Sequence, residues 1–527
     1  MNDYSLLNLI LPRYLRSINS GQKPLIGNYN SPDIDIDIDG VNPPSSTPID
    51  TSVDDELIFL LGGEEVHLRR VKWSPVNFYA LPGYISINSL SDSSDGYVFS
   101  RGRTLYPMDI SSALAVYALG IEASHTGGSH KVIDLCCSPG NKFQMISELL
   151  SSDSLMVGVD ISESRLNVCK SLLRRYNRHF SCSINSNSNS SAMGPRQLVF
   201  HGDSTLFSRD NNSMGSLVYD STVYRHEYSH LADRMKLNKS TRSKIRKSLK
   251  AVEGRLLQGR EPSSVGEDSW TESSGFISLD NFDYAIVDAE CTHDASYRHL
   301  SHIIVPHNDQ DNDYLLPLSS DGSSVKPDFR LYISDNSSSS SSSSSNNKSH
   351  RKMNESNNLR ALQRDLVRNG FHLLRPGGVL VYSTCSKDEL QNEEIIKWLL
   401  LTEGRRAQVV PIIEDIRQYI SKATVCRSSS ISICSDEHAV VETSTMSPNE
   451  EEGIGLLQQE LPELVSSLKT LDTTGIRELS DRICRDVASQ DSPILMESTT
   501  LSGAMHISYK SGMSGLFIAK IRKAVDD

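Results

Sequence analysis

A short apolar segment followed at once by a turn of small residues constrains the fold of this chain more than any other feature. Residues 131–135 read Lys-Val-Ile-Asp-Leu, which is typical of a buried strand. Residues 136–141 form a tight turn that contains Pro139 and Gly140. Apolar residues then recur at helical spacing at Phe143, Ile146 and Leu150. Because the first backbone N–H groups of a helix lack partners within it, a strand, turn and helix in this order predict a ligand cradle.

The sequence of this turn excludes the two common glycine-rich phosphate loops. It is neither Gly-x-Gly-x-x-Gly nor Gly-x-x-x-x-Gly-Lys-Ser/Thr. Asp134 ends the strand, at the edge where open α/β sheets bind their ligands. From this stretch alone, an ordinary strand-to-helix connection remains the alternative to a ligand site.

Strand-like and helix-like segments alternate along the rest of the chain. Further strands are predicted at 155–160, 197–201, 282–288, 379–383 and 515–521, with helices at 162–177, 359–374 and 389–400. Such alternation predicts an α/β fold with a doubly wound, largely parallel, Rossmann-like sheet.

Composition divides the chain around this core. The first 26 residues are expected to hold a helix over 4–18, with Pro12 as a candidate break. Five further parts are expected after them: a polar linker at 27–52, a small α/β module at 53–105, the core at 106–403, a mostly inserted segment at 404–510 and a closing strand within 511–527. Within the core, polar insertions are expected at 181–195, 208–280 and 305–355, the last with a run of serines.

The overall charge limits how this protein can contact nucleic acid. The 527 residues carry a net charge of −13 and only 37% are hydrophobic, so part of the chain is expected to lie outside any packed core. The acidic total argues against nucleic-acid binding over the whole surface, and any such contact must be local. Basic residues gather at 234–250, a candidate RNA contact whose alternative is a solvated or nuclear-localisation-like basic loop.

Cysteine usage and hydropathy bear on the compartment. Nine cysteines without a Cys-x-x-Cys pattern indicate neither a disulfide framework nor a zinc site. We therefore expect a reducing, intracellular compartment, either the cytoplasm or the nucleus and nucleolus. The sequence contains no run of eighteen apolar residues, so no membrane helix is predicted. A mitochondrial transit peptide is a weaker alternative, because Asp3 and the sparse arginines are atypical of one.

Acidic residues follow several of the predicted strands. Since the carboxyl ends of parallel strands share one edge, these acids should meet there. They are Asp134, Asp160, Asp203 and Asp288. Asp160 could accept both hydroxyls of a ribose, or it could instead cap the following helix. Asp203 could bind an adenine amino group, but a turn-forming role is the more ordinary one for it.

Two cysteines should reach the same edge. Cys291 ends the sequence Asp-Ala-Glu-Cys, and Cys385 lies within Ser-Thr-Cys-Ser. A thiol exposed at a strand end beside hydroxyl groups can act as a thiolate nucleophile, although a lone free cysteine is more often an inert core residue. His293 and His299 lie nearby, and we expect them to be structural or solvated, so no metal site is predicted.

Taken in order, these motifs resemble those of the Sun/Fmu family of AdoMet-dependent RNA 5-methylcytosine methyltransferases. Residues 134–142, Asp-Leu-Cys-Cys-Ser-Pro-Gly-Asn-Lys, are similar to that family's Asp-Leu-Cys-Ala-Ala-Pro-Gly-Gly-Lys signature, and 157–166 are similar to its second motif. Residues 282–291 resemble its Asp-Ala-Pro-Cys motif, 373–386 its Thr-Cys-Ser motif, and 515–521 its closing strand.

Two positions depart from the family's pattern. Asn141 replaces the second glycine of the turn, and we expect it to survive there because Asn tolerates left-handed backbone geometry. Glu290 replaces the proline before Cys291, which bears on the geometry of the cysteine that the family uses for product release.

The resemblance implies an RNA (cytosine-5-)-methyltransferase that uses S-adenosyl-L-methionine (AdoMet). Cys385 would be the nucleophile, Cys291 would assist product release, and Asp288 and Lys142 would complete the catalytic set. The AdoMet pocket would be lined by Cys136, Cys137, Ser138, Pro139, Gly140, Asn141, Lys142, Asp160, Arg165, Asp203 and Asp288. The module at 53–105 would help position structured RNA, with tRNA preferred over rRNA, and we expect a monomer.

Two other functions remain open at this point. The first is a non-catalytic RNA-binding scaffold with the same fold, which Glu290 and the long insertions would suit. The second is a methyltransferase for another acceptor. Residues 288–291 lack the Asp/Asn-Pro-Pro-aromatic sequence of amine-directed enzymes, and the chain lacks the Pro-Cys nucleophile motif of DNA enzymes, so both acceptors are disfavoured.

Overall fold

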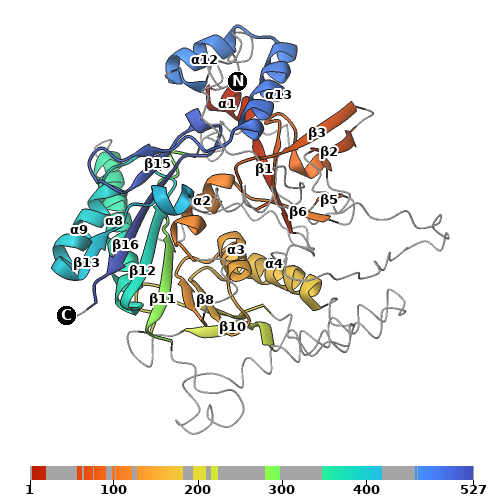
Figure 1. The fold of residues 1–527 in the computed structure, drawn as a ribbon. Coiled ribbons are helices and arrows are strands. Elements are labelled where there is room, and N and C mark those ends of the chain that lie inside the picture. Colours follow the sequence, from red (N-terminus) through yellow and green to blue (C-terminus); the bar gives the residue numbers. More distant parts are fainter. Residues whose placement is uncertain are drawn as a thin grey trace, which may run out of the picture.

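Two β-sheets, one of six strands and one of ten, organise the protein (Figure 1). The computed structural model describes residues 3–18, 56–61, 64–74, 76–90, 98–100, 103–121, 128–181, 194–208, 215–222, 279–296, 347–417, 457–459 and 461–525. The basic run at 234–250 and His299 lie outside these described residues.

The smaller sheet is antiparallel and has the strand order β2-β3-β4-β1-β6-β5. Its strands are β1 (Arg13–Ile18), β2 (Glu56–Leu61), β3 (Glu64–Arg70), β4 (Phe78–Leu81), β5 (Val98–Ser100) and β6 (Arg103–Pro107), with η1 (Ile87–Leu90) after β4.

The predicted helix over 4–18 is therefore wrong in its second half. The helix α1 (Asp3–Ile10) ends just before Pro12, whose ring and missing N–H disfavour continuation. Residues 13–18 instead form a strand between β4 and β6, where Tyr14 and Leu15 are buried. Pairing with two neighbouring strands outweighs the local helical pattern, which sequence periodicity does not reveal.

The larger sheet is doubly wound at its centre, as the sequence predicts. Its order is β10-β9-β8-β7-β11-β12-β16-β15-β14, and β13 also pairs with β16. The strands are β7 (Lys131–Asp134), β8 (Leu155–Asp160), β9 (Arg196–His201), β10 (Ser216–Asp220), β11 (Phe282–Asp288), β12 (Leu374–Thr384), β13 (Ala407–Val409), β14 (Met496–Glu497), β15 (Met505–Ile507) and β16 (Leu516–Lys523).

The direction of the strands explains where a ligand can bind. Strands β9, β8, β7, β11 and β12 are parallel neighbours, and the strand order reverses at β7. A crevice is expected at the carboxyl end of β7, because the connections on its two sides diverge there. The sheet is mixed rather than largely parallel, since β10 and β13 to β16 all pair antiparallel.

Helices cover both faces of the larger sheet (Figure 1). They are α2 (Ile110–Ala118), α3 (Asn141–Leu149), α4 (Glu163–Ser181), α8 (Asn347–Leu373) and α9 (Glu393–Glu403), with η3 (Gly404–Arg406) after α9. Val132 packs in one apolar cluster with α2, α3 and α4, whereas Ile133 packs in a second cluster with α8 and α9. This split follows from the alternation of side chains across a strand. Among the described helices, none is long and apolar enough to cross a membrane.

Segments expected to be insertions contribute ordered elements. The predicted insertion at 404–510 contains α12 (Leu461–Lys469), α13 (Thr473–Ser489), β14, β15 and η4 (Tyr509–Ser511). Helices α12 and α13 lie beside α1 (Figure 1), and Ser480 on α13 accepts a hydrogen bond from the Gly83 amide at 3.0 Å. Their apolar residues recur at helical spacing within polar sequence, which composition alone conceals. Likewise β10 lies within 208–280, and α8 begins within 305–355.

Candidate functional site

A cavity of about 390 Å³ lies at the carboxyl end of β7, where the crevice is expected. Its lining includes Asp134, residues 136–142 and Asp288, so the structure brings these residues together as predicted from the sequence. Sequence reasoning missed the opposite wall, which consists of Tyr14, Ile87, Pro107, Met108, Asp109 and Ser112. These residues come from the smaller sheet and from the start of α2. Their position depends on how the two sheets pack, which no local motif encodes.

The turn after β7 takes its shape from one glycine. Gly140 has φ 108°, a backbone conformation that side chains rarely adopt, and a Cβ there would lie 3.0 Å from Cys169 Sγ. Asn141 is the first residue of α3 and is not in the left-handed region. The turn therefore does not need the tolerance of Asn for left-handed geometry that we expect from the sequence. Its side chain Nδ2 instead donates to the Pro107 carbonyl at 3.4 Å, which ties the turn to the opposite wall.

Asp134 places a buried carboxyl at the floor of the cavity. Only 2% of its surface is exposed, and Oδ1 accepts a hydrogen bond from the Cys136 amide at 3.1 Å. Burial raises the pKa of Asp134 to about 7, and the nearby Asp288 adds to this rise. A cationic ligand in the cavity would favour the ionised form of this carboxyl, because opposite charges attract strongly where water is excluded.

Ser138 offers an unsatisfied polar atom to a ligand. Its Oγ is buried and has no hydrogen-bond partner among the residues that the structure describes. Its amide donates to Asp160 Oδ2 at 3.2 Å, and its carbonyl accepts from Arg165 Nη2 at 2.7 Å. Because a buried hydroxyl without a partner costs free energy, a ligand that bonds this Oγ would be stabilised here.

Asp160 and Arg165, two predicted cofactor residues, support the turn from behind. Both carboxylate oxygens of Asp160 accept backbone N–H groups, from Ser138 and from Ser162 at 2.8 Å at the start of α4. Asp160 therefore caps the start of α4, which is the alternative expected from the sequence, and it also holds the turn of the cradle in place. Neither Asp160 nor Arg165 lines the cavity.

Asp203 adopts the turn geometry that is the alternative to an adenine contact. Its Oδ1 accepts hydrogen bonds from the amide and the hydroxyl of Thr205, at 2.9 and 2.7 Å. The side chain is exposed and does not line the cavity.

Lys142 connects the cradle to the two cysteines. Its Nζ donates to Asp288 Oδ2 at 2.7 Å and to Ser112 Oγ at 3.3 Å, while Ser383 Oγ donates to Asp288 Oδ1 at 2.7 Å. Burial by itself would lower the pKa of Lys142, but Asp288 outweighs that effect and holds the pKa above its usual value. Lys142 therefore remains a cation next to Cys385, where it favours the thiolate.

The two cysteines meet just beyond the ends of β11 and β12. Cys291 Sγ lies 3.2 Å from Cys385 Sγ, although the residues are 94 positions apart. Parallel pairing of Asp288 with Ser383 fixes this approach, because Cys291 follows Asp288 by three residues and Cys385 follows Ser383 by two. Cys385 is partly exposed and Cys291 is buried, so Cys385 is the more accessible of the two.

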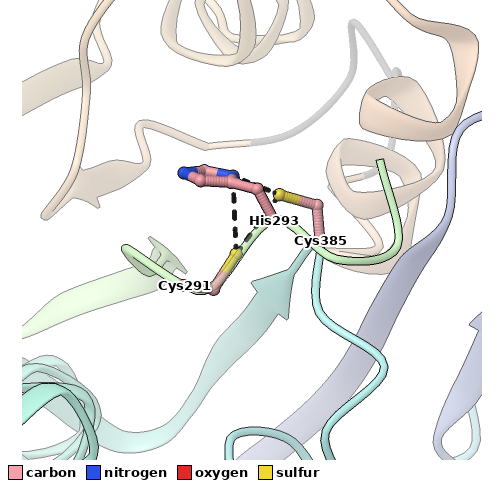
Figure 2. Close-up of side chains that lie close together, drawn as sticks. All are labelled: Cys291, His293 and Cys385. Carbon is pink, nitrogen blue, oxygen red and sulfur yellow. Dashed lines mark hydrogen bonds between the residues drawn. The ribbon is translucent and has the colours of Figure 1, made fainter. Parts of the chain in front are cut away.

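His293 completes this group, as Figure 2 shows. Its Nδ1 lies 2.7 Å from Cys385 Sγ and 3.7 Å from Cys291 Sγ, and its Nε2 lies 3.4 Å from Glu290 Oε1. The sequence suggested a structural or solvated histidine, and the structure instead places it against both thiols. The signal available in the sequence is its position two residues after Cys291, but only the fold shows that Cys385 lies nearer to it than Cys291 does.

The three side chains favour one shared negative charge. Hydrogen bonds from Cys385 and from His293 together lower the pKa of Cys291 to about 6. The hydrogen bonds to Cys291 and Glu290 raise the pKa of His293 to about 10. The resulting thiolate at Cys291 raises the pKa of Cys385 well above its usual value. The charge belongs to the cysteine pair, since His293 Nδ1 can hydrogen-bond either sulfur.

These three residues are also of the kinds that hold a soft metal ion. Their ligand atoms all lie within 4.8 Å of one another. Two sulfurs bound to tetrahedral zinc, each about 2.3 Å from the metal, would stand roughly 3.8 Å apart. The observed separation of 3.2 Å would therefore have to widen for zinc to bind.

A doubly wound sheet, a cavity at its switch point and paired strand-end cysteines define the class as a Rossmann-like methyltransferase fold. Residues 339–454 match the family model described as 16S rRNA methyltransferase RsmB/F. This stretch contains β12 and Cys385, and its match confirms the resemblance to the RsmB/F (Sun/Fmu) family that the motifs indicate.

Similar proteins match only a short part of the chain. Ribosomal RNA small subunit methyltransferase F of Klebsiella pneumoniae (strain 342) is 42% identical over 59 residues, which is 11% of this chain and 12% of that protein. The protein of the same name from Salmonella heidelberg (strain SL476) is 46% identical over 59 residues, with the same coverage. The matched segment thus spans 12% of these relatives' length.

Solved structures match a larger share of the chain, at low TM-scores. A methyltransferase homolog from Pyrococcus horikoshii is 17% identical, with a TM-score of 0.36, covering 87% of this chain and 78% of that one. NSun6 from Pyrococcus horikoshii with SFG is 13% identical, with a TM-score of 0.33, covering 80% of this chain and 54% of that one.

Proposed function

We propose that this protein is an AdoMet-dependent RNA (cytosine-5-)-methyltransferase that works through a covalent cysteine adduct. The observation that carries the proposal is the approach of the Cys291 and Cys385 sulfurs to 3.2 Å, beside the ion pair of Lys142 and Asp288. One thiol can attack while the other assists departure only if both reach the same base. Two inert core cysteines would not need a buried lysine and a histidine next to them.

The polar groups that line the cavity suit AdoMet. AdoMet, when bound, supplies a methyl group on a positively charged sulfur, which carbon 5 of the base takes. Asp134 offers a carboxylate to the positive charge, and Ser138 Oγ offers a hydrogen bond that it makes to no described residue. Asp160 and Arg165 would hold the turn that presents these groups.

The residues of this chain would perform the chemistry on the base. Carbon 5 of cytosine is a poor nucleophile. When the Cys385 thiolate bonds to carbon 6, the electron pair of the 5,6 double bond moves to carbon 5, which can then be methylated. A base next removes the carbon 5 proton, the double bond re-forms, and the bond between carbon 6 and sulfur breaks to return the thiolate.

The neighbouring groups have distinct roles in this sequence of steps. Asp288 would bind the cytosine edge and support protonation at ring nitrogen 3, and Lys142 would help keep Cys385 ionised. Cys291 would assist the release of the product. The target base must be unpaired or flipped out of a stack, because the thiols lie beyond strand ends and not on an open surface.

The RNA substrate is the finer part of this proposal. The sequence favours tRNA over rRNA, whereas the relatives with matching segments are named for ribosomal RNA, so both classes belong in the test. The basic run at 234–250 is a further candidate contact that lies outside the described residues.

The experiment is methyl transfer from labelled AdoMet to tRNA and to ribosomal RNA, followed by digestion to nucleosides. We expect label in 5-methylcytidine with the wild type. Cys385→Ala should transfer at least about a thousandfold more slowly, because the covalent step is lost. Cys484→Ala, which removes a buried thiol on α13 outside the site, is the matched control and should stay active.

A non-catalytic RNA-binding scaffold is the second candidate, and Glu290 favours it. This carboxylate stands where the family has proline and contacts His293 and Arg165, at 3.4 and 3.7 Å. Binding of RNA by the wild type, with no label in any nucleoside, would establish the scaffold and refute the methyltransferase.

A further inference from the structure

The loop that follows β11 presents His293 to the two cysteines in an unusual backbone conformation. His293 has φ 56°, in the left-handed region that few non-glycine residues occupy. Such a conformation costs free energy and persists only where its surroundings hold it. In this conformation the ring lies between the thiols on one side and Glu290 on the other.

Hydrogen bonds on both sides of the loop fix this position. The Ala295 amide donates to the Cys385 carbonyl at 3.0 Å, and the Thr292 amide donates to Gln391 Oε1 at 3.1 Å. Gln363 Nε2 donates to the Glu290 carbonyl at 2.7 Å. The loop is therefore fastened to α8, to the segment after β12 and to Gln391, two residues before α9. The imidazole is held against the thiols by the fold and not by its own contact alone.

We propose that His293 is the general base that ionises the pair of Cys385 and Cys291. Glu290 positions the imidazole ring for this task and stabilises its protonated form. In this step the sulfur–hydrogen bond of Cys385 breaks, its electron pair stays on sulfur, and a new nitrogen–hydrogen bond forms at Nδ1. The Nε2 hydrogen then points at the Glu290 carboxylate, which stabilises the imidazolium. This inference rests on the proposed function for its purpose, but the proton transfer itself needs neither RNA nor AdoMet.

The charges around the pair are consistent with an imidazolium and a thiolate. Lys142 favours the thiolate of Cys385, and Asp288 opposes it. Burial would raise the pKa of Glu290, but His293 and then Arg165, which faces the same carboxylate, hold this pKa below its usual value and keep Glu290 anionic. Asp294 is the remaining acid on this loop. Its Oδ1 accepts from the Thr292 and Ser386 hydroxyls, each at 2.7 Å, so it fastens the loop to the segment after β12.

This arrangement assigns a role to the carboxylate of Glu290, at a position where the family has proline. A proline would place no carboxylate near Nε2, so the histidine and the acid make sense as a pair. Arg165 also donates to the Ser138 carbonyl, so the same cation contacts the cradle and the acid of this pair.

The test measures thiol ionisation directly, on the full-length protein without RNA. Iodoacetamide alkylation of Cys385 and Cys291 is followed from pH 5 to 9 by peptide mass spectrometry, with Cys136, which lines the neighbouring cavity, as the internal reference. We expect His293→Asn to slow the faster-reacting thiol of the pair about tenfold at pH 7 and to move its midpoint up by about one pH unit. Asn suits this variant because it tolerates the left-handed backbone.

Glu290→Gln is the second variant, since it keeps an acceptor for Nε2 and removes the charge. It should shift the midpoint in the same direction by a smaller amount. Circular dichroism melting checks that both variants fold. Unchanged alkylation profiles in folded His293→Asn would overturn the proposal. Faster alkylation of the wild type after EDTA treatment would also overturn it, because the three groups would then hold a metal ion.

The outcome is separable from that of the proposed function. If the wild type methylates no RNA but the alkylation profile depends on His293, the general-base role of His293 stands and the methyltransferase proposal falls. If methylation occurs and the profile is independent of His293, the reverse holds.

Discussion

The two halves of the site are built in opposite ways. The cradle at residues 134–142 is one contiguous stretch whose shape comes from backbone contacts, including those of Gly140 and Asp160. The cysteine side is assembled from two loops 94 positions apart and consists of groups that titrate, Cys291, His293 and Cys385. A rigid backbone cradle suits recognition of a cofactor, and mobile protons suit covalent chemistry. Changes in the cradle should therefore alter binding, and changes on the cysteine side should alter rate.

Lys142 is a residue of the cradle that also lies next to Cys385, so its removal should affect both binding and rate. Lys142→Met keeps most of the length of the side chain and removes the cation that pairs with Asp288. We expect methyl transfer to fall about a hundredfold, because the Cys385 thiolate and Asp288 both lose this partner. AdoMet affinity measured by calorimetry should fall as well. Lys131→Met, at the other end of β7, is the control and should change neither.

Gly140→Ala should damage the cradle and leave thiol chemistry alone. The added methyl group meets Cys169 Sγ at 3.0 Å in a left-handed backbone, a strain of about 1–3 kcal/mol. We expect AdoMet binding to weaken about tenfold and the melting temperature to drop. Gly377→Ala has a similar φ of 79° but contacts nothing closer than 3.5 Å, and it should leave AdoMet binding intact. Equal binding by both variants would show that the turn is not the cofactor site.

Asp134 gives the cradle a pH dependence of its own. Its pKa rises from 3.8 to about 7 on folding, so between those values the folded protein binds more protons than the unfolded chain. Stability from this group is therefore present at low pH and is lost as pH rises through the window. Asp134→Asn should stabilise the protein relative to wild type at pH 8 more than at pH 5.

The same carboxyl should make AdoMet binding sensitive to pH. Wild-type affinity should fall as pH drops below about 7, because a protonated Asp134 no longer attracts the positive sulfur. In Asp134→Asn the affinity should be weaker and flat with pH. Calorimetric titrations from pH 5.5 to 8.5 measure this difference, and a pH-dependent affinity in the variant would contradict the assignment.

The contrast between the two halves also explains what could be predicted from the sequence. The cradle and the central strands are contiguous patterns, so Asp134, Lys142 and the strand ends were found directly. His293 was not, because its importance depends on Cys385, which only parallel pairing of β11 with β12 brings near.

Tertiary packing likewise decided the elements that sequence reasoning missed. Residues 13–18 carry a helical pattern but pair with β4 and β6. The apolar stripe of α13 is diluted by polar residues, so its segment resembles an insertion. Tyr14 reaches the cavity because the smaller sheet packs against the larger one, a contact without a local signal.

The central claim is that Cys385 bonds to the base and Cys291 helps to release it. The most direct measurement is a denaturing gel of Cys291→Ala incubated with AdoMet and substrate RNA. The account predicts a band in which RNA stays attached to the protein through Cys385, and its disappearance in the double variant with Cys385→Ala. A variant that turns over normally, or a wild type that methylates RNA while Cys291→Ala forms no adduct, would contradict this division of labour between the two thiols.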